Sequence, residues 1–132
     1  MHSILIQEKL TVDREFAVRI AYDGKLQMPV ITYTAQGGRP ILWVEKEHPD
    51  QVFKIPIEDV TKILDMRTLL KAAENLDTMA CQSSLAFLMK NLWQCFIERD
   101  CLHLEINPLI YSNNKFYAGH CFVMVDEDAR FR

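Results

Sequence analysis

The sequence predicts an α+β domain in which a mostly antiparallel sheet has helices packed on one face. Runs rich in β-branched and aromatic residues, separated by turn residues, occupy the first third and the end of the chain. A long stretch with apolar residues at helical spacing lies between these two groups. The 132 residues fit one domain that is large enough to bury a core.

The first group of strands begins at the start of the chain. Since domains seldom begin inside a strand, an apolar run at residues 4–6 indicates that more chain lies upstream. The second and third strands are expected to pair as an antiparallel hairpin around a turn at Asp23 and Gly24. The five extended segments predicted here are residues 4–6, 16–22, 28–33, 41–44 and 51–55.

Two helical regions are predicted in the middle of the chain. Residues 58–70 mix polar and apolar positions and predict one or two short helices. Residues 78–99 predict a long helix, with Asp77 or Thr78 as its N-cap. Its apolar stripe favours core packing over a cofactor site. The stripe consists of Leu85, Leu88, Met89, Leu92, Trp93 and Phe96.

Two strands, residues 102–111 and 116–125, close the chain as a second hairpin around a turn at residues 112–114. Side chains alternate between the two faces of a strand. One face of the first strand is therefore expected to carry Leu102, Leu104 and Ile106. The other face is expected to carry His103, Glu105 and Asn107.

The polar face of this strand is the first candidate site. A carboxylate and an amide two residues apart, at Glu105 and Asn107, can both reach one hard cation such as Mg²⁺. Pro108 ends the ladder and stiffens the end of the site. The alternative is that Glu105 and Asn107 simply lie on a half-exposed polar face of the sheet.

Composition excludes several classes of function. The net charge of -3 and the lack of a basic stripe argue against a nucleic-acid binder. The start of the chain has neither the pattern of a signal peptide nor that of a transit peptide, and no apolar stretch has the length of a membrane span. Cysteines without CxxC spacing indicate reduced, mostly buried thiols of an intracellular protein. They are Cys81, Cys95, Cys101 and Cys121.

Residues 105–109, EINPL, resemble the signature of the succinyl-CoA ligase (synthetase) β-subunit, with ATP-citrate lyase as a more distant relative. The resemblance extends along essentially the whole chain. It implies the C-terminal subdomain of an ATP-grasp fold, so residues 1–132 would form one partial domain without the N-terminal lobe and the CoA-ligase domain. The other matches, in order, are Arg14-Glu15, Asp23, Pro29-Val30, Gln36-Gly37-Gly38, Pro49, Lys54, Ile57, Phe96 with Asp100, and residues 126–132.

The resemblance also implies roles for individual residues. Glu15 would lie near the ribose and phosphates of ATP or GTP, and Asn107 would bind Mg²⁺. Glu105 would contact the phosphohistidine loop of a partner α-subunit, where a carboxylate can orient an imidazole. Backbone groups of a hinge strand would face the adenine. These hinge residues are Leu5, Ile6 and Gln7.

Two positions depart from the family pattern. The second magnesium ligand of the family is an aspartate, and His120 stands at its place; imidazole suits transition metals better than Mg²⁺. An acidic residue of the family's glycine loop is replaced by Leu42, next to Pro40, which stiffens the loop. One alternative is a transition-metal site made of His103, Glu105, His120 and Cys121. A thiol–imidazole nucleophile formed by Cys121 and His120 is disfavoured, because adjacent strand residues point to opposite faces.

Two functions follow from these observations. The first is a truncated, catalytically degenerate ATP-grasp module, a pseudoenzyme that serves as an accessory or structural subunit; His120 favours this hypothesis. The alternative is one part of an active, nucleotide- and magnesium-dependent acid–thiol (succinate–CoA) ligase of the tricarboxylic acid cycle, completed by another chain. The resemblance implies Mg²⁺ with ATP or GTP, or no cofactor in this chain. It also implies an α-like subunit or a larger assembly as partner, and a mitochondrial matrix location.

Overall fold

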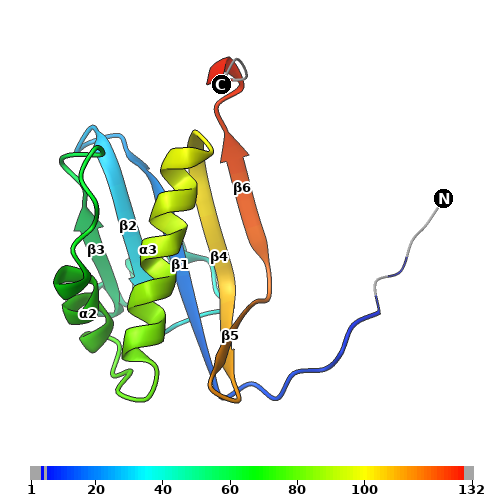
Figure 1. Ribbon diagram of the computed structural model, residues 1–132. Coiled ribbons are helices and arrows are strands. Elements are labelled where there is room, and N and C mark those ends of the chain that lie inside the picture. Colours follow the sequence, from blue (N-terminus) through cyan, green and yellow to red (C-terminus); the bar gives the residue numbers. More distant parts are fainter. Residues whose placement is uncertain (1–3, 5, 130–132) are drawn as a thin grey trace.

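Six strands form one antiparallel sheet in the computed structural model, which describes residue 4 and residues 6–129 (Figure 1). The strand order is β3-β2-β1-β4-β5, and β6 pairs with β4 beyond β5. The predicted fold class is therefore confirmed. The strands are β1 (Arg14–Asp23), β2 (Met28–Thr34), β3 (Val52–Pro56), β4 (Cys101–Ser112), β5 (Lys115–Ala118) and β6 (Cys121–Val125). The helices are α1 (Ile41–Glu47), α2 (Met66–Glu74) and α3 (Gln82–Glu98), with short 3₁₀ turns η1 (Pro49–Gln51) and η2 (Glu127–Ala129).

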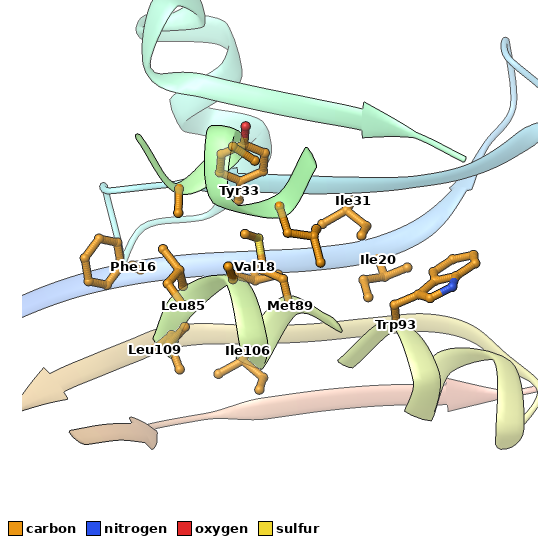
Figure 2. Packing of buried hydrophobic residues seen from close by; sticks show 14 of the residues in the cluster. Phe16, Val18, Ile20, Ile31, Tyr33, Leu85, Met89, Trp93, Ile106 and Leu109 are labelled. Carbon is orange, nitrogen blue, oxygen red and sulfur yellow. The ribbon is translucent and has the colours of Figure 1, made fainter. Parts of the chain in front are cut away.

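The main core lies between the sheet and the layer formed by α2 and α3 (Figure 2). Alternate residues of β1 point into it, as the period of two requires. From α3, Leu85, Met89 and Trp93 meet them, which confirms the predicted apolar stripe as core packing. Burying each such side chain contributes roughly 1.5–3 kcal/mol. The β1 residues in this core are Phe16, Val18 and Ile20, all fully buried.

The opposite face of the sheet is partly covered by the residues that follow β2. Thr32 and Thr34 are buried, although they alternate with Ile31 and Tyr33 of the main core and so point away from it. Ile41 and Val44 of α1 are also buried outside that core. The chain after β2 therefore folds back over this second face, and a polar area of it stays open.

The start of β1 is fastened to its surroundings by side chains. Arg14 donates hydrogen bonds to the backbone carbonyls of Asp77 and, at 3.1 Å, Leu76. The carboxylate of Asp13 accepts a hydrogen bond from the Asn113 backbone N–H at 3.0 Å. Residues 6–13, before β1, have no regular structure. Figure 1 shows this arm leaving the sheet near the turn between β4 and β5.

Two of the predicted strands are absent. The strand predicted at residues 4–6 is wrong for its two described residues, since Ile4 and Ile6 are 88% and 90% exposed and have no regular structure; Leu5 lies outside the described residues. The segment predicted as extended at residues 41–44 is the helix α1. A helix buries Ile41 and Val44 on one side, because residues three apart share a helical face.

The helix boundaries also differ from the prediction. Of the region predicted as one or two short helices, residues 58–70, only the part within α2 is helical. Asp65 caps the start of α2, because its carboxylate accepts a hydrogen bond from the Arg67 N–H at 3.2 Å. The long helix begins at Gln82, not at residue 78, and neither predicted cap is used. Asp77 has a left-handed backbone, with φ of 50°, and the Thr78 hydroxyl donates to the carbonyl of Ala73.

The final hairpin contains an interruption that the sequence prediction missed. Its turn is confirmed, with Asn113 and Asn114 in left-handed conformations, φ 49° and 62°. The second strand, however, is broken between Ala118 and Cys121 into β5 and β6. A bulge near the start of β4 turns Leu102 outward, 39% exposed. Of the three residues predicted to share one face, only Leu104 and Ile106 therefore point into the core.

Candidate functional site

A row of polar side chains on β4 forms the centre of the candidate site. His103, Glu105 and Asn107 are partly exposed on the face opposite the main core. His103 Nε2 lies 3.3 Å from Glu105 Oε2, and Asn107 Nδ2 donates to Glu105 Oε1, also at 3.3 Å. Both oxygens of the Glu105 carboxylate therefore have a partner within the row.

The loop after β2 docks on Asn107. The backbone N–H of Gly38 donates to Asn107 Oδ1 at 2.9 Å, and Asn107 Nδ2 donates to the carbonyl of Arg39 at 2.8 Å. The Arg39 guanidinium lies over the ring of Trp43, 5.0 Å from its centre, which ties the loop to α1. The amide of Asn107 thus serves as a clamp between β4 and a loop almost 70 residues away in the chain.

This loop passes very close to β1, and its two glycines allow the approach. A Cβ atom on Gly37 would lie 2.5 Å from the carbonyl oxygen of Phe16. Gly38 has a φ of 77°, a conformation that favours glycine. A Cβ on Gly38 would lie 3.2 Å from Glu15 Oε2. The structure therefore brings Glu15 and Asn107 to the same loop, next to Glu105.

A hollow of about 250 Å³ continues the polar face across β1, β2 and β3. Arg19, Lys54 and His103 are among the residues that line it, with the buried Thr32. Lys54 forms an ion pair with Glu45 of α1. Arg19 lies opposite Glu105 in the register of β1 and β4. Cationic and carboxylate groups alternate here, so the face is suited to a polar, charged ligand or a polar protein surface.

The backbone of His120 lies beside that of Asn107. The backbone N–H of Asn107 donates to the His120 carbonyl at 3.0 Å, and the His120 side chain is exposed. No carboxylate is thus supplied from this position. The pair of residues at this place supplies an amide, whose Oδ1 already accepts a hydrogen bond, and an imidazole, which suits transition metals better than Mg²⁺. The pair therefore does not fit a magnesium site, which is normally built on carboxylates.

The transition-metal alternative also finds no support. In the part of the chain that the structure describes, no group of three or more His, Cys, Asp or Glu side chains could hold a metal ion. His103 and Glu105 do meet, but His120 and Cys121 do not complete a set with them.

The predicted hinge residues do not join the site. Ile6 and Gln7 lie exposed on the arm before β1, and Leu5 lies outside the described residues. The arm leaves the sheet (Figure 1), so this chain alone places no hinge backbone against the polar face. Their contact with a nucleotide stays a prediction.

The cysteines take no part in this site. All four are free thiols; Cys81 and Cys101 are buried, whereas Cys95 and Cys121 are exposed. The prediction of mostly buried thiols therefore holds for two of them. Burial raises the pKa of the Cys81 and Cys101 thiols above its ordinary value, which makes them poor nucleophiles.

Sequence reasoning missed several residues of the polar face. Arg19 carried a usable signal, because a charged residue within an otherwise apolar strand must point away from the core. The roles of Gly38 and Arg39 had no such signal, since their contact with Asn107 joins distant parts of the chain.

Among residues 6–129, none of the helices has both the length and the apolar composition that a membrane span needs.

Comparisons with known proteins identify the family of this fold. Residues 1–111 match the family model of the ATP-grasp domain. The β-subunit of an ADP-forming succinate–CoA ligase from Leptospira biflexa is 30% identical over 131 residues, which cover 98% of this chain and 33% of that protein. The mitochondrial β-subunit from Oryza sativa is 33% identical over 98% of this chain and 31% of its own length. A mitochondrial relative also occurs in Caenorhabditis elegans, and an archaeal one in Methanocaldococcus jannaschii.

Among solved structures, ATP citrate lyase from Methanothrix soehngenii, in complex with citrate and coenzyme A, superposes with a TM-score of 0.69. The two are 17% identical, and the match covers 92% of this chain and 26% of that one. At this identity the likeness concerns the fold alone. The chain spans about a third of the length of the curated relatives it matches.

Proposed function

Since the chain belongs to the ATP-grasp domain family and resembles succinate–CoA ligase β-subunits, we propose that it is an accessory or structural module that does not catalyse ligation by itself. In this proposal residues 1–132 contribute one part of an ATP-grasp domain. The polar face of the sheet then serves as a contact surface.

The observation that carries this proposal is the histidine beside Asn107. Mg²⁺ is held in proteins by one or two carboxylates together with waters and phosphates. The residue whose backbone pairs with Asn107 is His120, and the Asn107 amide is already used to hold the loop at Gly38 and Arg39. Such a site has lost most of its attraction for a hard cation.

A partner is part of the same proposal. We expect an α-subunit-like protein to contact the face around Glu105, since the relatives are β-subunits. Arg19, which lies opposite Glu105 on the neighbouring strand, and Lys54, farther along the same polar face, offer both signs of charge for such a contact. A mitochondrial matrix location is proposed on the names of the plant and worm relatives.

Nucleotide binding tests the proposal directly. We expect no change in the melting temperature of the chain with Mg²⁺ and ATP, GTP or ADP. A ligand at one hundred times its Kd would add about 2.7 kcal/mol, which is on the order of 5–10 °C for a domain of this size. A shift of that size in the unmodified chain would contradict the proposal.

Restoring a carboxylate at residue 120 gives a second test of the proposal. His120→Asp restores a carboxylate beside Asn107 and is expected to give calorimetric Mg²⁺ binding that the unmodified chain lacks. Asn91→Asp adds the same charge on the exposed side of α3 and serves as the matched control. Equal Mg²⁺ binding by the unmodified chain would show that His120 is not the cause of degeneracy.

A second candidate is an active ligase completed by another chain. It is favoured by the clustering of Glu15, Glu105 and Asn107 on one face, because these are the residues that the resemblance assigns to nucleotide, phosphohistidine and metal. The test is to mix the chain with a separately produced N-terminal lobe and an α-subunit of a related ligase. CoA-dependent release of nucleoside diphosphate from nucleotide and succinate would establish this candidate, and would replace the first.

A further inference from the structure

The strand β6 forms an unprotected edge of the sheet. Within residues 6–129 it pairs with β4 alone, so its outer edge has no strand partner. All five of its side chains are exposed, from 47% to 52% for Phe122 to Val125, and none is charged. Figure 1 shows β6 standing to one side of α3, which covers the middle of the sheet. A row of free backbone groups flanked by apolar side chains is a template for pairing with another strand.

The other edges of the sheet lack this property. β3, at the far side, contains Lys54 and ends in Pro56, and both residue types prevent pairing at natural sheet edges. β5 has only four residues and begins with Lys115. Since the chain protects these strands and leaves β6 open, β6 is the edge on which a partner strand fits.

We propose that β6 of one copy of this chain pairs antiparallel with β6 of a second copy, about a twofold axis at Val123. In this register Phe122 of each copy lies opposite Met124 of the other, and Cys121 lies opposite Val125. A twofold contact brings the same surface patch together twice. Because β6 carries no charge, no like charges meet within the paired strands.

The backbone directions agree with an axis at Val123. The carbonyl of His120 accepts from the N–H of Asn107, so the backbone of His120 points toward β4. In an antiparallel ladder the direction alternates from one residue to the next. The N–H and C=O of Val123, three residues later, therefore point outward. Two Val123 residues can then exchange a pair of hydrogen bonds across the axis.

Polar side chains at the two ends of β6 favour the same register. Pairing centred on Val123 places His120 of each copy opposite Asp126 of the other, so the contact occurs twice. His120 is exposed, and Asp126 is partly exposed at the other end of the strand. An imidazole and a carboxylate at facing positions of neighbouring strands can pair as polar side chains. The pairing is thus apolar at its centre and polar at both ends.

The expected dimer is weak and reversible. Five residues a side cover less surface than the roughly 1,200–2,000 Å² of a stable interface. We therefore expect a dissociation constant between about 1 μM and 1 mM. The partner in this inference is a second copy of the chain, and its existence does not depend on whether the polar face binds a nucleotide.

Sedimentation velocity on the full chain, over a concentration series from about 1 μM to 1 mM, tests the proposal. The unmodified chain is expected to shift from monomer to dimer, and Val123→Lys to stay monomeric at every concentration. Val60→Lys is the matched control, since Val60 is 41% exposed on a loop away from β6; it should dimerise as the unmodified chain does. A monomeric unmodified chain, or a folded Val123→Lys variant that still dimerises, would overturn the proposal.

A cross-linking variant tests the register and does not depend on the folding of the lysine variant. Paired residues that exchange hydrogen bonds have Cα atoms about 5.5 Å apart, within the range of a disulfide. In a background carrying Cys95→Ser and Cys121→Ser, oxidised Val123→Cys is expected to form a covalent dimer on a non-reducing gel. Val60→Cys in that background should stay monomeric. Equal cross-linking of both variants would overturn the proposal.

Discussion

Gly37 is a residue whose identity the structure requires. A Cβ at this position would lie 2.5 Å from the backbone oxygen and 2.6 Å from the backbone nitrogen of Phe16. These atoms belong to the strand β1, so they cannot move away as the end of a flexible side chain could. We expect Gly37→Ala to lower the free energy of unfolding by about 1–3 kcal/mol, as overpacking does. Urea denaturation measures the change.

Gly24 provides the comparison for Gly37. Nothing lies within 4 Å of a Cβ built there, so Gly24→Ala should leave the stability unchanged or raise it by up to about 1 kcal/mol. If both variants lost the same stability, steric contact with Phe16 would not be the reason for the glycine at residue 37.

Asn107 has a structural role that can be measured apart from any ligand. Its amide makes hydrogen bonds with Gly38, Arg39 and Glu105, all partly open to water. We expect Asn107→Ala to lower the free energy of unfolding by about 1–2 kcal/mol, and amide hydrogen exchange to speed up at Gly38.

The exposed Asn91 of α3 is the matched control for Asn107. Asn91→Ala should change the stability by less than about 0.5 kcal/mol. Unchanged exchange at Gly38 in the Asn107→Ala variant would mean that the amide does not hold the loop.

At the scale of elements, α2 depends on its first cap. The Asp65 carboxylate accepts the Arg67 N–H, and Leu69, Ala72 and Ala73 of the same helix are buried in the core. We expect Asp65→Ala to cost about 1 kcal/mol, and Asp65→Ser, which can still cap, to cost much less. Thermal denaturation of both variants separates the cap from a general effect of charge. Equal losses would contradict a capping role.

The elements also show what the sequence could and could not predict. The hairpin β1–β2 and the long helix α3 have strong periodic patterns, and both were predicted within a few residues. Ile41 to Val44 is too short to show a helical period, and its β-branched residues favoured a strand. The break at Gly119 and His120 separates two runs that look continuous in the sequence. In both cases contacts with the rest of the sheet decided the structure.

At the scale of the whole molecule, α2 and α3 cover one face of the sheet, whereas the other face is only partly covered and keeps an open polar area. Alternation along β4 predicted the side of Glu105 and Asn107, because that depends on local geometry alone. The docking of residues 37–39 on that face was not predictable, since it joins segments almost 70 residues apart. Residues 4–6 were predicted as a strand, but a strand needs a hydrogen-bonded neighbour, and the described part of this chain offers none there.

The anchoring of Arg14 at the start of β1 has a consequence for limited proteolysis. Trypsin cuts after exposed Lys or Arg in extended, unpaired chain. Lys9 meets this condition, whereas Arg14 has its guanidinium on the carbonyls of Leu76 and Asp77. Brief digestion should therefore cut after Lys9 before it cuts after Arg14, which mass spectrometry would detect as a product beginning at Leu10. Early cleavage after Arg14 would show that this tether opens readily in solution. The trimmed product would keep the complete sheet and be a compact sample for crystallisation.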